Sequence, residues 1–272
     1  MGKICKTGIM AALCAAALLT GCGKEEPHVL TVGTTGQLAK YTQIDDKGNL
    51  EGFEIDLWNE IARRMDRPVR FRTGALSGLW GMLDSGSLDS IANPTAATPE
   101  RGEKYSFTVP YDYDPYVLVT PADAPAPSGD GIEAFQGSAV CVAAGTNLSM
   151  VLDQWNEAHG HPVQVGYLGD QSVLLPAVMD GTYRAAFMLR SGAEIAARDL
   201  HMKIHIYSSH IPVLPAVYAF RKDAAGEELS GQVSHVLEDM RNDGTLQRLS
   251  VKWFGADLTV PPDSSGSHGD ET

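Results

Sequence analysis

Two regions of the chain present groups that can hold a small anion. Arg101 follows Thr98-Pro99-Glu100. Its guanidinium offers two parallel N–H groups that match a carboxylate, and it stays charged when it is removed from water. Gly145-Thr146-Asn147 lies between an apolar run and an amphipathic segment. Backbone N–H groups at the start of a helix, together with the positive end of its dipole, form an anion site.

Each region also has a purely structural explanation. Arg101 can be a surface arginine just after a turn. Thr146 or Asn147 can serve as a plain N-cap for the helix that follows. The cap uses only some of the free N–H groups, so capping and anion binding by this loop are compatible.

The cysteines predict neither a disulfide framework nor a catalytic thiol. Cys5 and Cys14 precede Cys22 in the N-terminal apolar region, and Cys141 lies in an apolar run at 139–144. A lone cysteine in such a run is usually a small hydrophobe. The sequence contains no C-x-x-C or H-E-x-x-H spacing, which are the usual zinc signatures. We therefore expect no metal, no cofactor and no catalytic residue.

Residues 1–22 are typical of an export signal that ends in a lipid-attachment site. Lys3 and Lys6 precede a short apolar stretch at 9–19, which is too short to span a bilayer. Leu19-Thr20-Gly21-Cys22 then resembles the lipobox of bacterial lipoproteins. We expect Cys22 to be lipidated and the mature chain to lie in the periplasm or on the outer face of the cell membrane. The alternative is an ordinary signal peptide with an incidental cysteine.

Apolar runs and amphipathic segments alternate twice along the chain. Strands are expected at 29–34, 69–71 and 88–91, with a helix from about Phe53 and a second one, capped by Ser77, that ends near Gly86. A second copy follows, with strands at 139–143, 163–165 and 184–188 and helices between them. This alternation predicts an α/β fold with mostly parallel sheets that helices cover on both faces.

The organisation predicts two lobes joined by two crossings of the chain. Residues 23–28 form a tether, and residues 258–272 read as a disordered tail. The first lobe is expected to span 29–118 and 214–257, with two C-terminal helices returning to it, and the second lobe to span 119–213. The crossings are expected near 117–120 and 213–217. Such a hinged clamp closes around a ligand.

Five motifs, in order, resemble those of the polar amino-acid-binding family of bacterial extracellular solute-binding proteins. They lie at 48–57, 83–91, 98–111, 142–146 and 243–255. The resemblance implies a two-lobed periplasmic-binding-protein fold of the type II kind. It also implies a monomeric substrate-binding component of an ABC importer, which captures an amino acid or related small carboxylate and docks on a membrane permease. A formal net charge of −13 makes nucleic acid an improbable partner.

The resemblance also implies roles for individual residues. Arg101 would clamp the ligand carboxylate from the first lobe, and Gly145, Thr146 and Asn147 would hold it from the second. Thr95 and Ala96 stand where many members carry a small hydroxyl residue. Leu38 or Tyr41 would replace the aromatic wall of the family, although Tyr41 can equally be a structural plug.

One position departs from the family pattern. Members commonly end the third strand of the second lobe with an aspartate that grips the α-ammonium of the ligand, and Leu189 falls there. A buried, unpaired ammonium costs several kcal/mol. Either another acid compensates, with Glu194, Glu54 and Asp170 as candidates, or the ligand lacks a free α-amine.

Two roles remain open for Arg190, and a structural role is expected for the tryptophans. Arg190 either binds a second acidic group of the ligand or is a solvated residue near a helix start. The tryptophans fall on helix faces and are expected to pack in cores. They are Trp58, Trp80, Trp155 and Trp253.

Two other functions remain open at this point. Some proteins that share this fold are dehydratases of cyclic carboxylates such as prephenate or arogenate. Such an enzyme needs an acid in the cleft, and Glu194 is the first candidate. A sensor module is the third possibility, although no transmembrane helix or signalling domain follows in the sequence.

Overall fold

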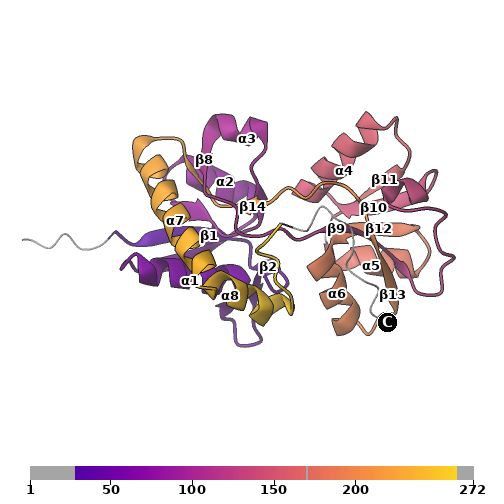
Figure 1. Ribbon diagram of the computed structural model, residues 1–272, viewed down its shortest axis with the longest axis horizontal. Coiled ribbons are helices and arrows are strands. Elements are labelled where there is room, and N and C mark those ends of the chain that lie inside the picture. Colours follow the sequence, from indigo (N-terminus) through magenta and orange to yellow (C-terminus); the bar gives the residue numbers. More distant parts are fainter. Residues whose placement is uncertain (1–27, 170, 262–272) are drawn as a thin grey trace, which may run out of the picture.

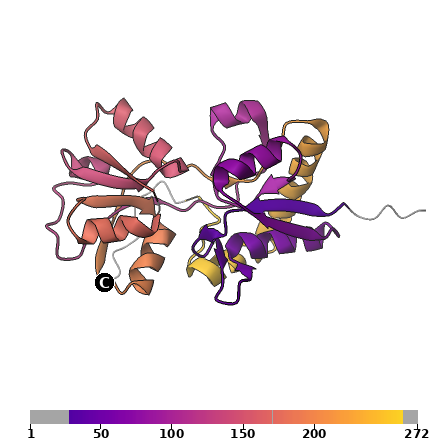
Figure 2. The same cartoon turned by 180° about the vertical axis from the view of Figure 1, so that it is seen from behind.

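The computed structural model describes residues 28–169 and 171–261. Two α/β lobes lie side by side and are joined by two crossings of the chain (Figures 1 and 2), which confirms the predicted fold class. Within these ranges no helix is both long and apolar enough to span a bilayer. The predictions for Cys22 and the export signal, for Asp170 and for residues 262–272 lie outside the described residues. The predicted disordered tail begins too early, because the Leu258 carbonyl oxygen accepts from the Tyr113 amide and Thr259 is buried.

The first lobe is built on a parallel sheet in the order β5-β1-β6. Its strands are β1 Leu30–Thr34, β5 Val69–Thr73 and β6 Ser90–Ile91. They alternate with helices α1 Phe53–Arg64 and α2 Leu76–Asp84. An antiparallel meander follows β1, formed by β2 Gln37–Leu38, β3 Thr42–Ile44 and β4 Leu50–Glu51.

The first lobe is completed by segments that come just before and just after the second lobe in the sequence. Helix α3 Pro99–Lys104 stands between β7 Thr95–Ala96 and β8 Tyr105–Phe107. After the second lobe, β14 Ala216–Val217 pairs with β7, and β15 Ala219–Arg221 pairs with β8. Helices α7 Ala224–Asn242 and α8 Thr245–Phe254 then pack on α1. The chain therefore enters and leaves the second lobe through adjacent strands of the first.

The second lobe is a five-stranded sheet in the order β11-β10-β12-β9-β13. The strands are β9 Tyr116–Pro121, β10 Ala139–Ala143, β11 Gln164–Leu168, β12 Ala185–Leu189 and β13 Ile204–Ser208. The helices are η1 Ile132–Phe135, α4 Asn147–Ala158, η2 Gln171–Val173, α5 Leu174–Met179 and α6 Arg190–Asp199. Strand β9 runs antiparallel to both β12 and β13, so the sheet is mixed.

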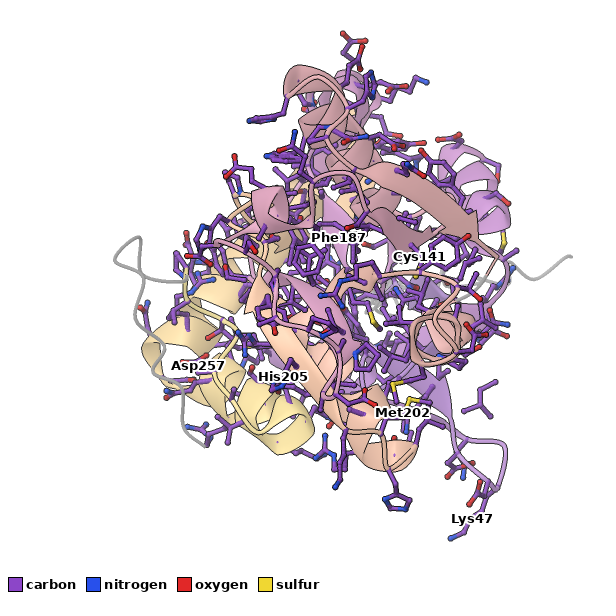
Figure 3. The ribbon with its side chains drawn as sticks, turned by 90° about the vertical axis from the view of Figure 1, so that its right-hand side faces the viewer. Lys47, Cys141, Phe187, Met202, His205 and Asp257 are labelled. Atoms are coloured by element: carbon purple, nitrogen blue, oxygen red, sulfur yellow. The ribbon has the colours of Figure 1, made fainter. Side chains whose placement is uncertain are left out.

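Apolar side chains cover both faces of the second sheet, because successive residues of a strand point to opposite faces. Val140 and Phe187 belong to one buried cluster, and Cys141 belongs to the other (Figure 3). Cys141 is a free thiol, and burial raises its pKa to about 12. The prediction that Cys141 is a small hydrophobe is confirmed.

Two local predictions are wrong. The whole of β9 pairs within the second sheet, so residues 116–118 pack in the second lobe and 117–120 is not a crossing. The chain crosses just before Tyr116, after the bridge between Asp112 and Ala216. In α2 the N-cap position is held by Ala75, so Ser77 lies inside the helix and does not cap it.

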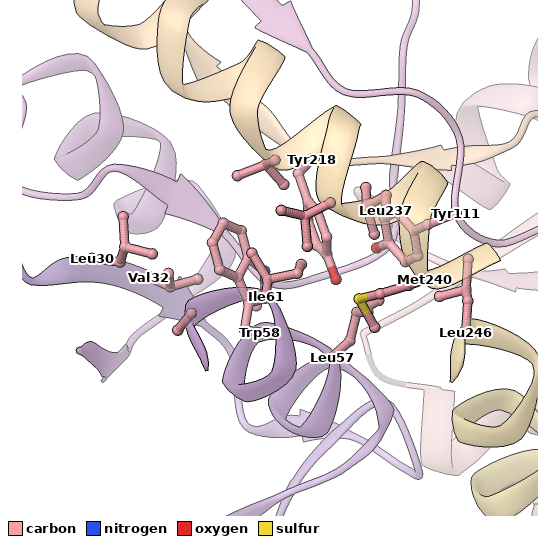
Figure 4. Packing of buried hydrophobic residues seen from close by; sticks show 14 of the residues in the cluster. Leu30, Val32, Leu57, Trp58, Ile61, Tyr111, Tyr218, Leu237, Met240 and Leu246 are labelled. Atoms are coloured by element: carbon pink, nitrogen blue, oxygen red, sulfur yellow. The ribbon is translucent and has the colours of Figure 1, made fainter. Parts of the chain in front are cut away.

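The core of the first lobe joins α1 to the C-terminal helices (Figure 4). The Trp58 ring lies 4.9 Å from that of Tyr218, which confirms its predicted core role. Gly52 permits the turn into α1: its φ is +136°, and a Cβ there would come within 2.2 Å of the Tyr41 carbonyl oxygen. The turn brings α1 against Tyr41, which is buried in the same core.

Glu54 on α1 is a buried acid whose hydrogen bonds come only from tyrosine. Tyr111 and Tyr218 each donate to one of its carboxylate oxygens at 2.5 Å, and the two rings stack 4.3 Å apart. Burial raises the pKa of Glu54 to about 7, although both hydroxyl groups lower it. In the part of the chain that the structure describes, Glu54 forms no ion pair.

This raised pKa predicts how the stability of the fold depends on pH. Between its unfolded pKa of 4.5 and its folded pKa of about 7, Glu54 binds more protons in the folded chain. The free energy of unfolding should therefore fall as the pH rises through this range, by about 3 kcal/mol from Glu54. Glu54→Gln should flatten this dependence in urea unfolding measured at a series of pH values.

The matched control is Glu238→Gln on the exposed face of α7, which should leave the dependence unchanged. Asp112 and Asp114 are also buried with raised pKa values, so a residual fall should remain. An equally steep fall in the wild type and in Glu54→Gln would contradict the assignment to Glu54.

Candidate functional site

A cavity of about 370 Å³ lies between the lobes, which is within the usual size of a small-molecule site. The first lobe contributes residues after β1, on α2, on β7 and on α3. The second lobe contributes the loop from β10 to α4 and the end of β12, and the crossings contribute two acids. The lining residues used below are Leu38, Trp80, Thr95, Ala96, Arg101, Asp112, Asp114, Gly145, Thr146, Asn147 and Leu189.

Arg101 projects from α3 into this cavity. The helix starts with Thr98 as N-cap and Pro99 in its first turn, which places Arg101 just inside the lobe boundary. Its Nη1 donates to the carbonyl oxygen of Ala96 at 3.2 Å and to Oδ1 of Asn147 at 2.8 Å. No carboxylate in the described chain forms an ion pair with it. Burial lowers the pKa of Arg101 from its ordinary value, yet a guanidinium stays charged.

The loop of the second lobe faces Arg101 across the cavity. Gly145 adopts φ +71°, the left-handed region that favours glycine, although a Cβ there would meet no atom within 4 Å. Thr146 caps α4, since its hydroxyl oxygen accepts from the Ser149 amide at 3.2 Å. Asn147 does not cap: its side chain bonds to Arg101 and, at 3.4 Å, to the Pro94 carbonyl oxygen. The two lobes therefore touch through Asn147.

The structure distinguishes among the other predicted wall residues. Leu38, Thr95 and Ala96 line the cavity. Tyr41 is not among the lining residues: its ring packs in the first core, 4.7 Å from that of Phe254. The prediction that Tyr41 lines the pocket is therefore wrong, and the structural alternative is right.

Leu189 lines the cavity, whereas its neighbour Arg190 does not. Arg190 is paired with Glu194 on the same helix at 3.4 Å, and both side chains are substantially exposed. Arg190 is thus the solvated residue of the two alternatives. Glu54 lies in the first core and also lines no part of the cavity. Neither of these two candidate acids therefore lines the cavity beside Leu189.

The acids that do reach the cavity are Asp112 and Asp114, which the sequence analysis missed. The Tyr41 hydroxyl lies 3.0 Å from Oδ2 of Asp112 and 3.1 Å from Oδ2 of Asp114. Asp114 also accepts from the Ser191 amide at 3.2 Å and from the Ser191 hydroxyl. Burial raises the pKa of Asp114 to about 6, and burial with the charge of Asp114 raises the pKa of Asp112 well above its usual range.

The sequence places the two acids just before a strand, but only the order of the strands in the sheet shows that they reach the cavity. Tyr111-Asp112-Tyr113-Asp114 lies one residue before β9, with Pro115 between them. Because β9 runs antiparallel to β12, with Tyr116 opposite Leu189, the residues just before β9 lie beside those just after β12. The antiparallel pairing of β9 with β12 is not apparent from the sequence, so the sequence alone did not indicate these two acids as site residues.

Trp80 packs against a core cluster of the first lobe as expected, with its ring 4.8 Å from that of Tyr105. Its second position was missed: it also lines the cavity, where the Arg101 guanidinium lies 5.0 Å from its ring centre. A cation over an indole face is stabilised by the ring quadrupole. Trp80 therefore forms a wall of the site that also holds Arg101 in place.

No metal centre competes for this site in the described chain. Across residues 28–169 and 171–261, no group of three or more His, Cys, Asp or Glu side chains is placed to hold an ion. The ionisable groups of the cavity are a guanidinium and two carboxyl groups, and amides, hydroxyl groups and a helix start lie beside them. This set matches a small molecule that carries both a negative and a positive group.

Comparisons with known proteins place the chain in a family. Residues 30–256 match the model of the bacterial extracellular solute-binding proteins, family 3. The chain is 30% identical to the putative amino-acid ABC transporter-binding protein PatH of Vibrio harveyi, over 90% of this chain and 96% of PatH. It is 27% identical to the L-cystine-binding protein TcyK of Bacillus subtilis, over 92% of this chain and 93% of TcyK.

Solved structures resemble the same architecture. One is the probable amino-acid ABC transporter extracellular-binding protein ytmK from Bacillus subtilis, at 27% identity and a TM-score of 0.75 over 84% of this chain and 98% of that one. Another is an ancestral arginine-binding protein bound to arginine, at 25% identity and a TM-score of 0.72 over 85% of this chain and 100% of that one. These likenesses extend over both lobes.

Trp80 supplies a direct test of the cavity. Among the tryptophans, only Trp80 lines it, so a molecule that enters should change the emission of this indole. We expect Trp80→Phe to lose most of the ligand-induced change in tryptophan fluorescence. Trp155→Phe is the matched control, because Trp155 stacks on His159 outside the cavity. An unreduced response in Trp80→Phe would show that the bound molecule lies elsewhere.

Proposed function

Because the chain belongs to the bacterial extracellular solute-binding proteins, family 3, we propose that it captures an amino acid outside the cell for an ABC importer. Binding occurs between the lobes and involves no chemistry. The names of the relatives support this proposal, since they include an amino-acid transporter-binding protein and an L-cystine-binding protein. The partners are a small carboxylate ligand and the membrane permease of the importer.

One observation carries the proposal: a charged guanidinium without a protein counter-charge faces the cavity between the lobes. Arg101 makes two hydrogen bonds through Nη1 and leaves its remaining N–H groups for a ligand. A carboxylate that enters can form the bidentate pair, which offsets the desolvation of both charges. The loop at Gly145 and Thr146 presents the N-terminal end of α4 to the same carboxylate.

Closure of the lobes follows from this arrangement. The ligand carboxylate would contact α3 of the first lobe and α4 of the second, so it would be bound fully only when both lobes meet around it. Asn147 already links the two lobes through Arg101 at 2.8 Å. We propose that the two crossings, just before Tyr116 and just before Ala216, act as the hinge.

The dehydratase alternative has no support. Its proposed acid, Glu194, lies on the exposed side of α6 in an ion pair with Arg190. The relatives described above are named as binding proteins. We therefore assign the cavity to binding alone.

Replacing Arg101 should abolish capture. Removing one partner of a buried charge pair costs about 2–5 kcal/mol, which is enough to remove micromolar binding. Arg101→Ala should therefore show no measurable binding in calorimetry with the best ligand from an amino-acid panel. Arg101→Lys should bind worse than wild type, because an ammonium cannot make the forked contact.

Arg190→Ala is the control for these variants. It also removes one arginine near the lobe boundary, but Arg190 lines no part of the cavity, so its affinity should equal that of wild type. Wild-type affinity in Arg101→Ala would overturn the proposed carboxylate site.

We also propose that the mature chain is held at the membrane by a lipid on Cys22. The support is the sequence Leu19-Thr20-Gly21-Cys22 after a short apolar run, together with a family whose members are extracellular. Cys22→Ser should release soluble or unprocessed protein, detected by fractionation and by mass spectrometry of the N-terminus. A wild-type chain that is wholly soluble and cleaved elsewhere would contradict the anchor.

A further inference from the structure

An acidic corner, formed by Asp112 and Asp114, lies where the chain crosses from the first lobe to the second. Both side chains line the cavity, and their exposed fractions are only 2% and 4%. In the described part of the chain, no lysine, arginine or histidine forms an ion pair with either acid. Two buried acids thus face an open space without a protein cation.

The hydrogen bonds at the acidic corner are incomplete. The Asp114 carboxylate accepts hydrogen bonds from the amide and the hydroxyl group of Ser191. The single Tyr41 hydroxyl proton lies within reach of both acids and can satisfy only one at a time. Oδ1 of Asp112 is buried and has no partner in the described chain. Thr42 Oγ1 and Trp58 Nε1 are likewise unpaired in the described chain, but of these three residues only Asp112 lines the cavity, where a donor from a bound molecule can meet it.

The acidic corner lies beside Leu189, at the adjoining ends of two paired strands. Leu189 on β12 lies opposite Tyr116 on β9, two residues after Asp114. The Ser191 that holds Asp114 comes two residues after Leu189. Leu189 offers the cavity no charge, and the negative groups at this end of it are those of Asp112 and Asp114.

We propose that Asp112 and Asp114 form a cation subsite that accepts the ammonium group of an amino acid whose carboxylate is held by Arg101. An ammonium offers three donors. It can therefore bond to the unpaired oxygen of Asp112 and to Asp114 together. This inference rests on the proposed function and adds to it that the ligand is a zwitterion with a free amine. Tyr41 and Ser191 act as positioning residues, because their hydrogen bonds fix the two carboxyl groups at the cavity.

The protonation of the acidic corner agrees with this role. Burial raises the pKa of both acids, and the charge of Asp114 further opposes ionisation of Asp112. One of the pair can keep its proton while the other meets the ammonium. One ammonium group can therefore neutralise the charge of the site, although the site contains two carboxyl groups.

The test compares matched ligands on matched variants by calorimetry. The probes are a panel of L-amino acids that includes L-cystine, each beside the L-2-hydroxy acid that differs only by a hydroxyl in place of the ammonium. The wild type should bind its best amino acid at least about 30-fold more tightly than the hydroxy acid, the loss expected for an unpaired buried charge. This comparison needs no variant, so it does not depend on the folding of any mutant.

The variants locate the preference. Asp112→Asn and Asp114→Asn, singly and together, should weaken binding of the amino acid and leave binding of the hydroxy acid unchanged. Adding Leu189→Asp to the double variant should restore part of the preference, because it returns a carboxylate to the same end of the cavity. Glu54→Gln removes a buried acid outside the cavity and should keep the full preference.

The possible failures can be told apart. If the wild type binds an amino acid and its hydroxy acid equally, or if the Asn variants keep the wild-type preference, the cation subsite is wrong while capture of carboxylates stands. If no member of the panel binds the wild type, or if Arg101→Ala binds as tightly as the wild type, the proposed function fails and the subsite fails with it. Retained hydroxy-acid binding by the Asn variants shows that their sites are folded.

Discussion

Ionisable groups in the cleft between the lobes are removed from water without forming an ion pair in the described chain. Arg101 is half-buried and lies over the Trp80 ring, and its guanidinium donates to an amide oxygen and a carbonyl oxygen. Asp112 and Asp114 are nearly inaccessible and meet only hydroxyl groups and one amide. Each arrangement is unfavourable for a charge in the free protein. A ligand that carries the opposite charges would relieve both, which is the physical basis of the proposed capture between the lobes.

The fold keeps these opposite charges from pairing with each other. Arg101 is fixed on α3 by the Thr98 cap and by contact with Trp80. The acids are fixed on the crossing by Tyr41 and Ser191, one residue from each lobe. In the described chain no ion pair joins Arg101 to either acid, although all three residues line the same cavity.

Buried acids serve different purposes in the two surroundings. Glu54 has both carboxylate oxygens satisfied by tyrosines of the core, and it lines no cavity. Asp112 leaves one oxygen unpaired beside a cavity. Burial raises the pKa of both groups, so a raised pKa alone does not distinguish a structural acid from a binding one. The two acids differ instead in whether their oxygens are hydrogen-bonded and in whether they line the cavity.

The sequence by itself determined the alternation of strands and helices, the two-lobed α/β fold and the placement of Arg101 and Gly145-Thr146 at element boundaries. These features depend on local patterns: apolar periodicity, caps and glycines at turns. Only the tertiary structure decided which residues meet in the cleft. Tyr41 turned inward while Trp80 turned to the cavity. Asp114 came beside Leu189 because β9 pairs antiparallel with β12. Such pairing joins residues more than seventy positions apart, and no local pattern specifies which strands become neighbours.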